Sequence, residues 1–328
     1  MSFIAILVAL LLEQARPLAR THSIHHLLRS WARWTGRNFD AGRPQHGWLT
    51  WSVAVLAPSI AVLVMYWALV WAIGWPAAVV WNIVVLYITL GFRQFSHHFT
   101  EIRDALDAGD EERARQLLAS WQQLEAGDLP KSEIVREVIE HSVIAAHRHV
   151  FGVLAWFSVL SALGFGPAGA VFYRLSEFVS RYWQHKNEVL LQPVSSALQD
   201  VATRAWHVID WLPARITALG FAVVGSFEEA IDSWRNYKRR ESGDNDGVIL
   251  AATAGAINLH LGRAAVNTGR GSPSPAMEGL AGSSTPASTA IGQKPEVGHL
   301  RTVVGLVWRT VVMWMILLAL LTLARLLG

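Results

Sequence analysis

The stretch PQHGWLTWSVAVLAPSIAVLVMYWALVWAIGWPAAVVWNIVVLYITLGF, residues 44–92, decides the fold because it contains no Asp, Glu, Lys or Arg. A membrane-spanning helix needs about 20 predominantly apolar residues, so a run of 49 residues has room for two. Gly74-Trp75-Pro76 marks a turn in its middle, since proline is accepted in a first helical turn. The stretch predicts membrane helices at about Trp48–Ile73 and Pro76–Phe92, with tryptophans near their ends as in interfacial aromatic belts.

The composition of the whole chain agrees with a membrane environment. Of 328 residues, 52% are apolar and 16% charged, whereas a soluble domain has about 25% charged residues. The chain has no cysteine, which excludes disulfides and cysteine-ligated zinc or iron–sulfur sites. Its net charge of +3 does not indicate binding to nucleic acid.

The remaining apolar stretches are shorter or interrupted. Arg148 and Arg174 enclose 25 uncharged residues, but Gly and Pro at 164–169 divide them, so a re-entrant hairpin and a full crossing both stay open. Thr302–Leu327 predicts a final span, and Met1–Leu12 a short membrane helix without the features of a cleaved signal peptide. No stretch alternates like a strand for long, so the fold class is all-α, a polytopic integral membrane helical protein.

Positive charges predict the orientation in the membrane. Residues 13–47 hold six arginines and residues 235–240 read RNYKRR, which places both segments in the cytoplasm. Two spans after Arg43 return the chain to that side, so residues 93–148 are expected to form a cytoplasmic helical segment. We therefore expect a multi-pass protein of the bacterial inner (plasma) membrane, with the lipid bilayer as its partner.

The domain organisation follows from the same pattern. Residues 1–328 are expected to form a single membrane domain that includes the segment 93–148. Residues 267–299 are rich in Gly, Ser, Pro and Ala and are expected to be a flexible linker before the last membrane helix. The sequence does not indicate the oligomeric state.

The histidines do not predict a metal site. His22 and His26 lie one helical turn apart, and further histidines occur at 97, 98, 141, 147 and 149. A zinc site needs a third or fourth ligand, and no H-E-x-x-H motif or acidic partner accompanies them. We expect these histidines, which lie beside arginines, to contact lipid headgroups. P-loop, G-x-G-x-x-G and G-x-S-x-G motifs are also absent from the sequence.

Three motifs, in order along the chain, resemble those of one family. Asn245–Gly262 reads NDGVILAATAGAINLHLG and resembles the Asn-x-Gly…Ala-Gly-Ala…Leu-Gly stretch of the adenosylcobinamide-phosphate synthase (CobD/CbiB) family of cobalamin biosynthesis. Asp210–Leu219, DWLPARITAL, resembles the Asn-aromatic-x-Pro-Ala-Arg-Leu-Thr motif of that family. Lys186-Asn187-Glu188 resembles its Lys/Arg-Asn-Glu-Arg-Tyr motif. The resemblance covers most of the chain.

The resemblance implies a chemistry and a set of site residues. The family joins a propionate of adenosylcobyric acid to aminopropanol or its phosphate through an amide bond, and the carboxylate is activated with ATP and Mg²⁺. The matching polar positions imply a substrate-binding site of Lys186, Asn187, Glu188, Asp210, Arg215, Asn245 and Gly247. Lys186 and Arg215 would bind an anionic corrinoid. Catalytic residues are not identified.

The departures from the family pattern fall on acidic positions. Ala145 and Arg148 stand where the family has Asn and Asp, and Arg204-Ala205 replace paired aspartates. A magnesium site held by one or two carboxylates does not readily survive such a charge reversal. We therefore expect little or no amide-forming activity, and ATP and Mg²⁺ only if the ancestral activity is retained.

A second hypothesis is a non-catalytic membrane sensor or regulator of the AmpE type. Leu11-Leu12-Glu13 and His207–Arg215 resemble that branch, which lacks the same acids. Purely structural roles also stay open for the matching residues. Asp210 would cap a helix that begins near Pro213, Arg215 would anchor it at the interface, Asn245 and Gly247 would form a turn, and Gly255 would allow close helix packing.

Overall fold

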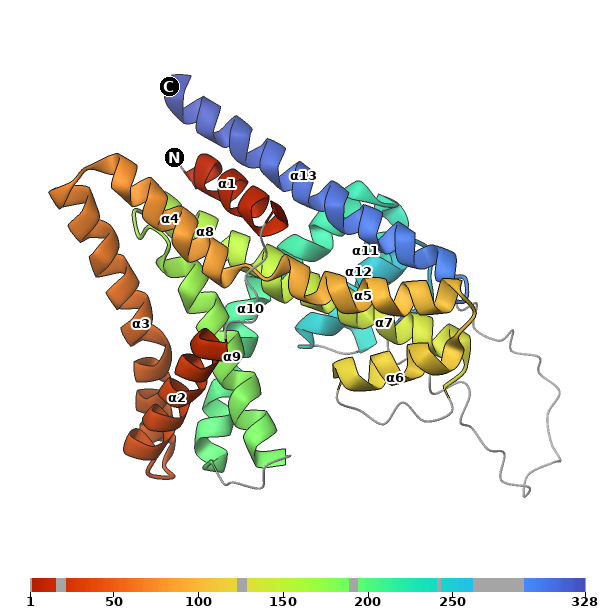
Figure 1. The fold of residues 1–328 in the computed structure, drawn as a ribbon, viewed down its shortest axis with the longest axis horizontal. Helices are drawn as coiled ribbons and strands as arrows, with labels where there is room; N and C mark the ends of the chain where they lie inside the picture. The colour runs from red at the N-terminus through yellow and green to blue at the C-terminus, as the bar shows by residue number, and fades with distance from the viewer. Residues whose placement is uncertain are drawn as a thin grey trace. The chain divides into compact units, whose positions relative to one another are not determined.

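The computed structural model describes residues 2–15, 22–122, 129–188, 194–240, 243–261 and 292–327. Within these ranges the secondary structure is helical (Figure 1), and the β contact is one isolated bridge between Leu259 and Gln293. The predicted all-α fold class is confirmed. Of the predicted linker 267–299, residues 267–291 lie outside the described residues, and its last three residues already belong to a helix that begins at Val297.

The described helices follow one another with short connections. In chain order they are α1 (Ser2–Ala15), α2 (His22–Phe39), α3 (Pro44–Ala72), α4 (Trp75–Thr89), α5 (Phe92–Asp107), α6 (Glu111–Gln122), α7 (Lys131–Ala146), the π-helix η1 (His147–Phe151), α8 (Gly152–Ala162), α9 (Ala168–Glu188), α10 (Ser196–Val224), α11 (Phe227–Arg240), α12 (Asn245–Ala256) and α13 (Val297–Leu327).

The chain divides into two compact units, each of which is described by itself. The first consists of Met1–Ser96, Ala145–Thr217 and Val311–Gly328, and the second of His97–Ile144 and Ala218–Thr310. The expectation of one membrane domain stays a prediction, as does the cytoplasmic location of residues 93–148.

Four of the described helical stretches are long and apolar enough to cross a membrane. They are Pro44–Ala72, Lys131–Ala162, Ser196–Val224 and Val297–Ala324. Two shorter apolar helices, Phe3–Ala15 and Trp75–Thr89, accompany them. The lengths and apolar character of these helices therefore indicate a membrane protein, as the charge-free run of residues 44–92 predicted.

The predicted hairpin of residues 44–92 is present as α3 and α4. Gly74 joins the two helices with φ of +103°, a conformation that favours glycine, and Pro76 lies in the first turn of α4. The indole of Trp81 donates a hydrogen bond to the carbonyl of Val62 at 3.2 Å and so links the two helices. Trp71, at the end of α3, is 86% exposed, as expected for a side chain that faces lipid or its interface.

Proline lies inside two long helices of the first unit, and each time a tryptophan indole donates a hydrogen bond to the carbonyl that the proline leaves without its helical donor. Pro58 in α3 and Pro213 in α10 lack the N–H that would bond the carbonyl four residues earlier, those of Ala54 and Ile209. The Ala54 carbonyl accepts a hydrogen bond from the Trp31 indole at 3.1 Å. The Ile209 carbonyl accepts one from the Trp156 indole at 3.0 Å. Both helices therefore continue through their prolines.

In the second unit, α11 and α12 pack at very short range. A Cβ on Gly255 would overlap the backbone at Glu229 and Ala230, and a Cβ on Gly225 would meet Ala256. The packing interpretation of Gly255 is thereby confirmed. Val248 and Ala252 of α12 form a buried apolar cluster with Ala218 of α10, and Trp234 and Tyr237 of α11 pack against it.

Candidate functional site

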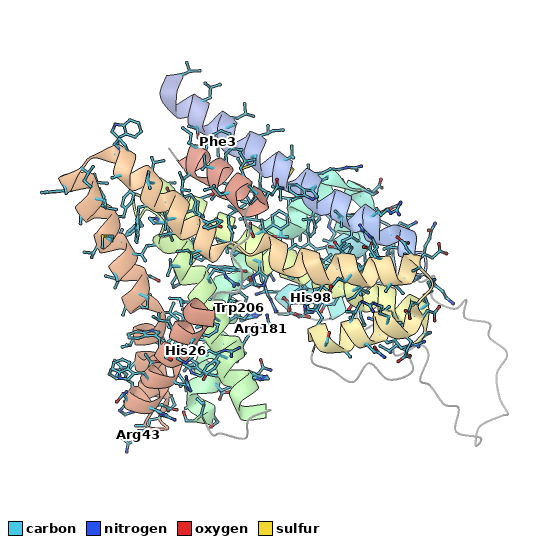
Figure 2. All side chains as sticks on the ribbon, viewed as in Figure 1. Phe3, His26, Arg43, His98, Arg181 and Trp206 are labelled. Atoms are coloured by element: carbon cyan, nitrogen blue, oxygen red, sulfur yellow. The ribbon has the colours of Figure 1, made fainter. Side chains whose placement is uncertain are left out.

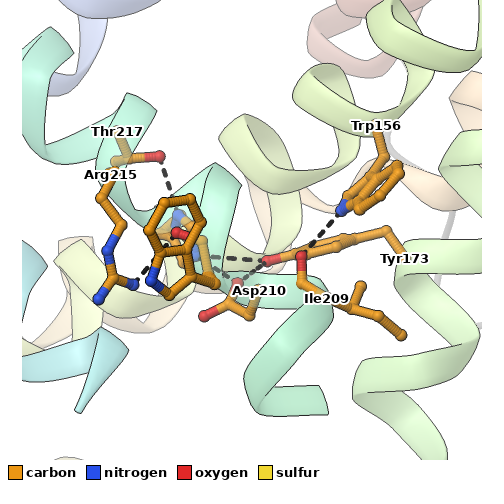
Figure 3. Close-up of polar contacts among 8 residues, drawn as sticks. Trp156, Tyr173, Ile209, Asp210, Arg215 and Thr217 are labelled. Atoms are coloured by element: carbon orange, nitrogen blue, oxygen red, sulfur yellow. Dashed lines mark hydrogen bonds and ion pairs between the residues drawn. The ribbon is translucent and has the colours of Figure 1, made fainter. Parts of the chain in front are cut away.

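The first unit contains a fully buried polar network centred on Asp210 (Figure 3). Oδ1 of Asp210 lies 2.8 Å from Nε2 of His147, and it accepts a hydrogen bond from the phenol of Tyr173 at 2.8 Å. The side chains of His147 and Asp210 are 0% and 1% exposed. An ionisable group inside apolar helices is costly, so its partners decide whether it is tolerated. Two elements supply the partners of Asp210, η1 with His147 and α9 with Tyr173, whereas Asp210 itself lies on α10.

Thr217 supplies the other contact of the imidazole. Its hydroxyl lies 2.9 Å from Nδ1 of His147 (Figure 3). An ionised carboxylate only accepts hydrogen bonds, so in the contact with Asp210 it is Nε2 of His147 that donates, whereas the Thr217 hydroxyl can either donate to Nδ1 or accept from it. The second oxygen of Asp210, Oδ2, is buried and has no hydrogen-bond partner among the described residues. That oxygen is the one open acceptor of the network.

Two local features place His147 and Tyr173 together. The π-helix His147–Phe151 widens the helix by one residue between α7 and α8, and such turns are frequent at functional sites. Gly152 follows it, and a Cβ at this position would overlap the ring of Tyr173. Glycine therefore lets the phenol pass directly over the helix backbone to reach Asp210.

The motif Asp210-Trp-Leu-Pro-Ala-Arg215 lies entirely within α10. The expectation that Asp210 caps a helix beginning near Pro213 is wrong, because the helix starts at Ser196 and Trp156 satisfies the carbonyl that Pro213 leaves free. Arg215 lies one turn beyond Trp211. Its guanidinium lies 4.8 Å from the centroid of the Trp211 ring and donates to the Trp211 carbonyl at 3.1 Å.

A second buried carboxylate in the first unit, Glu177 on α9, is bound by two arginines. Its Oε2 lies 3.0 Å from Arg174, and its Oε1 lies 3.1 Å from Arg181, which is labelled in Figure 2. Burial alone would raise the pKa of Glu177, but the positive charges of Arg174 and Arg181 outweigh it and lower the pKa to about 2. Glu177 is thus an ionised carboxylate with each oxygen paired with an arginine.

The second unit holds the other two predicted site residues. Asn245 is the first residue of α12 and is buried, and Gly247 lies in the same first turn. A Cβ on Gly247 would overlap the hydroxyl of Tyr237, which donates to Asp244 at 2.7 Å. The turn interpretation of Asn245 and Gly247 is wrong: both are helical, and the glycine makes room for Tyr237.

The structure thus places the predicted site residues in two groups. Lys186, Asn187 and Glu188 form the end of α9, with side chains outside what is described, and Asp210 and Arg215 lie on α10 in the same unit. Asn245 and Gly247 belong to the second unit. Their joint role as a substrate site stays a prediction.

Sequence reasoning missed His147 and Tyr173. We expected His147 to contact lipid headgroups, and this is wrong because the ring is fully buried and hydrogen-bonded. The available signal was a histidine followed within five residues by glycine, at the start of an apolar stretch. Only the fold shows that Tyr173 and Asp210 lie beside it.

Two acids of the described helices, Glu140 and Glu177, are compensated by arginines. Mg²⁺ in a nucleotide site is held by one or two free carboxylates. Glu140 is ion-paired with Arg136 at 2.7 Å, and Glu177 with two arginines. Among the described residues no group of three or more His, Cys, Asp or Glu could hold a metal ion. Neither Glu140 nor Glu177 is therefore free to hold Mg²⁺.

Comparison with known proteins decides the family. A family model described as CobD/Cbib protein matches residues 3–293. The chain belongs to the CobD/CbiB family. It is 29% identical over 283 residues to "Cobalamin biosynthesis protein CobD" of Stutzerimonas stutzeri (strain A1501), an alignment covering 86% of this chain and 84% of that protein.

Other CobD/CbiB relatives match over about half of their length. The protein of the same name from Chromobacterium violaceum is 31% identical over 180 residues, 55% of this chain and 54% of that protein. The one from Leptospira interrogans serovar copenhageni is 26% identical over 186 residues, 55% of this chain and 56% of that protein. No solved structure matches the chain. This CobD/CbiB member is a cobalamin biosynthesis protein with membrane-spanning helices, and the AmpE-type alternative is not favoured.

Proposed function

We propose that this family member binds a corrinoid at the step that attaches aminopropanol or its phosphate to adenosylcobyric acid, and that it no longer forms the amide bond itself. One observation carries the second half: Arg148 stands where the family has an aspartate, which reverses the charge at a position expected to hold Mg²⁺. Amide formation from a carboxylate requires its activation, and the carboxylates of Glu140 and Glu177 do not replace the missing acid, because both are ion-paired with arginines.

The support for corrinoid binding is the family itself together with the retained motif residues. Arg215 is held by Trp211 at the rim of the Asp210 network, and a guanidinium fork suits a carboxylate or phosphate. Lys186 lies in the last turn of α9 in the same unit, so both cations are candidates for the anionic corrinoid. Asp210 itself is buried and positions the part of α10 that carries Arg215.

Two measurements test this function separately. A strain lacking its cobinamide-phosphate synthase is supplied with cobyric acid and the gene for this chain, and we expect no cobalamin-dependent growth. Restored growth would show that amide formation is retained and that our interpretation of the paired acids is wrong.

Binding is measured on the purified full-length protein in detergent micelles, by the absorbance of cobyric acid retained with the protein. We expect Arg215→Gln to weaken retention about tenfold, because a hydrogen bond between charged groups is lost. Arg113→Gln, which changes an exposed arginine on α6, is the matched control and should bind like the wild type. If the wild type retains no cobyric acid, the corrinoid-binding function is excluded.

Location in the inner membrane, with the arginine-rich segment 13–47 inside, is part of the same proposal. The natural chain has no cysteine, so single cysteines report topology directly. A membrane-impermeant maleimide applied to spheroplasts should label Trp75→Cys, at the α3–α4 turn, and not Gln45→Cys. The reverse pattern would overturn the orientation.

A further inference from the structure

The outward face of α2 carries a stripe of cations that the proposed function does not use. Arg29, Arg33 and Arg37 lie four residues apart and are all exposed. His26, labelled in Figure 2, extends the stripe by one turn and is exposed as well. The 18 residues of α2 include no Asp or Glu, and no described acidic side chain forms an ion pair with these three arginines. The stripe is about 12 Å long from Arg29 to Arg37.

Large apolar side chains lie directly beside this stripe. Leu27 is 68% exposed and Trp34 is 49% exposed. Trp34 stacks on Trp31 with ring centroids 5.3 Å apart, so its indole is held in place on the surface. Water is a poor environment for two such side chains, and a purely acidic partner would leave them uncovered.

The opposite face of α2 is fixed to α3, a candidate membrane span, and to α9 of the same unit. The Trp31 indole donates to the carbonyl of Ala54 in α3 at 3.1 Å, and Ala32 of α2 is fully packed. From α9, the Trp183 indole donates to the carbonyl of Ala32 at 3.4 Å. The candidate span α3 begins at Pro44, only five residues after α2 ends at Phe39. Thus α2 lies where the chain enters the membrane.

We infer that α2 lies in the membrane interface and that Arg29, Arg33 and Arg37 bind the headgroups of anionic phospholipids. A lipid offers both chemistries that this face needs: phosphate for the guanidinium forks and acyl chains for Leu27 and Trp34. Each arginine near an anionic membrane surface contributes to attraction, and indole rings favour the headgroup level. The fixed position of α2 next to α3 brings the three arginines to that level together.

The test uses the purified full-length protein in a neutral detergent, titrated with short-chain phosphatidylglycerol or phosphatidylcholine and followed by native mass spectrometry. We expect phosphatidylglycerol to bind at least about tenfold more tightly, with an affinity that falls as salt is added. Arg29→Gln/Arg37→Gln should abolish most of that preference. Arg113→Gln/Arg204→Gln removes two exposed arginines elsewhere and should preserve it.

Three outcomes would overturn the inference. These are equal affinity for the two lipids in the wild type, an equal loss in both double variants, and full displacement of phosphatidylglycerol by millimolar inorganic phosphate, which would make the stripe a general anion site. The unfolding temperature of each variant in phosphatidylcholine discs shows that it is folded. The outcome is independent of corrinoid binding, because no corrinoid is present in the titration.

Discussion

Nε2 of His147 lies 2.8 Å from Oδ1 of Asp210, although 63 residues separate them in the sequence. The contact joins the π-helix η1 to α10, and the Tyr173 phenol adds α9 to the same carboxylate oxygen. A buried carboxylate without partners would cost several kcal/mol, on the order of the whole stability of a domain. The network therefore makes an ionisable residue acceptable inside apolar helices and cross-links three of them.

The phenol of Tyr173 should contribute to stability through its hydrogen bond to Asp210. We expect Tyr173→Phe to lower the free energy of unfolding by about 1 to 3 kcal/mol, because a donor to a buried charged acceptor is lost. Unfolding in mixed micelles by SDS titration measures it. Tyr66→Phe is the matched control, since Tyr66 forms no hydrogen bond with a described residue. Equal values for the two variants would contradict the role of the network.

The Trp156 indole should matter only while proline occupies position 213. We expect Trp156→Phe to cost about 1 to 2 kcal/mol, because the Ile209 carbonyl loses its donor. In the Pro213→Ala background a backbone N–H returns to that carbonyl, so the same substitution should cost clearly less. A double-mutant cycle in detergent measures this difference. Additive losses would show that the indole does not compensate for the proline.

Gly152 should tolerate no side chain. A Cβ there overlaps the Tyr173 ring, so we expect Gly152→Ala to destabilise the protein by about 1 to 3 kcal/mol, as overpacking does. Gly305→Ala in α13 is the control, because nothing lies within 4 Å of its Cβ position. Alanine is the better helix former there by about 1 kcal/mol, so this variant should be as stable as the wild type or more stable. Thermal unfolding of both variants in the same detergent compares them.

Glu177 should make stability depend on acid pH. Its pKa is lowered from 4.5 to about 2, so the folded state binds its proton less readily than the unfolded state. Its contribution is therefore fully present above pH 4.5 and is lost as the pH falls toward 2. We expect the stability difference between wild type and Glu177→Gln to be constant from pH 5 to 8 and to shrink below. A difference that grows in acid would refute the ion pairs with Arg174 and Arg181.

Much of the fold could be predicted because the membrane imposes simple rules on sequence. The charge-free run 44–92 and the breaker at Gly74-Trp75-Pro76 predicted the α3–α4 hairpin within a few residues at most ends. The contacts of the candidate site were harder to predict from the sequence. The Pro-Ala-Arg motif suggested a helix start, yet α10 continues through Pro213 because the indole of Trp156, 53 residues before Ile209 in the sequence, donates to the Ile209 carbonyl that the proline leaves free. A local pattern does not contain a partner that distant.

What the sequence by itself determined is the class of the protein: an all-helical membrane chain with an arginine-rich entry segment and the motif order of CobD/CbiB. Hydropathy and charge suffice for the helical membrane class, because in a bilayer each backbone polar group must be satisfied within its own helix, and the motif order rests on resemblance to the family. The tertiary structure alone decided which polar groups meet. In the tertiary structure His147 is buried against Asp210, the ring of Tyr173 lies over Gly152, and both carboxylate oxygens of Glu177 are ion-paired with arginines. These pairings depend on how helices distant in sequence pack, and no single segment specifies its neighbours.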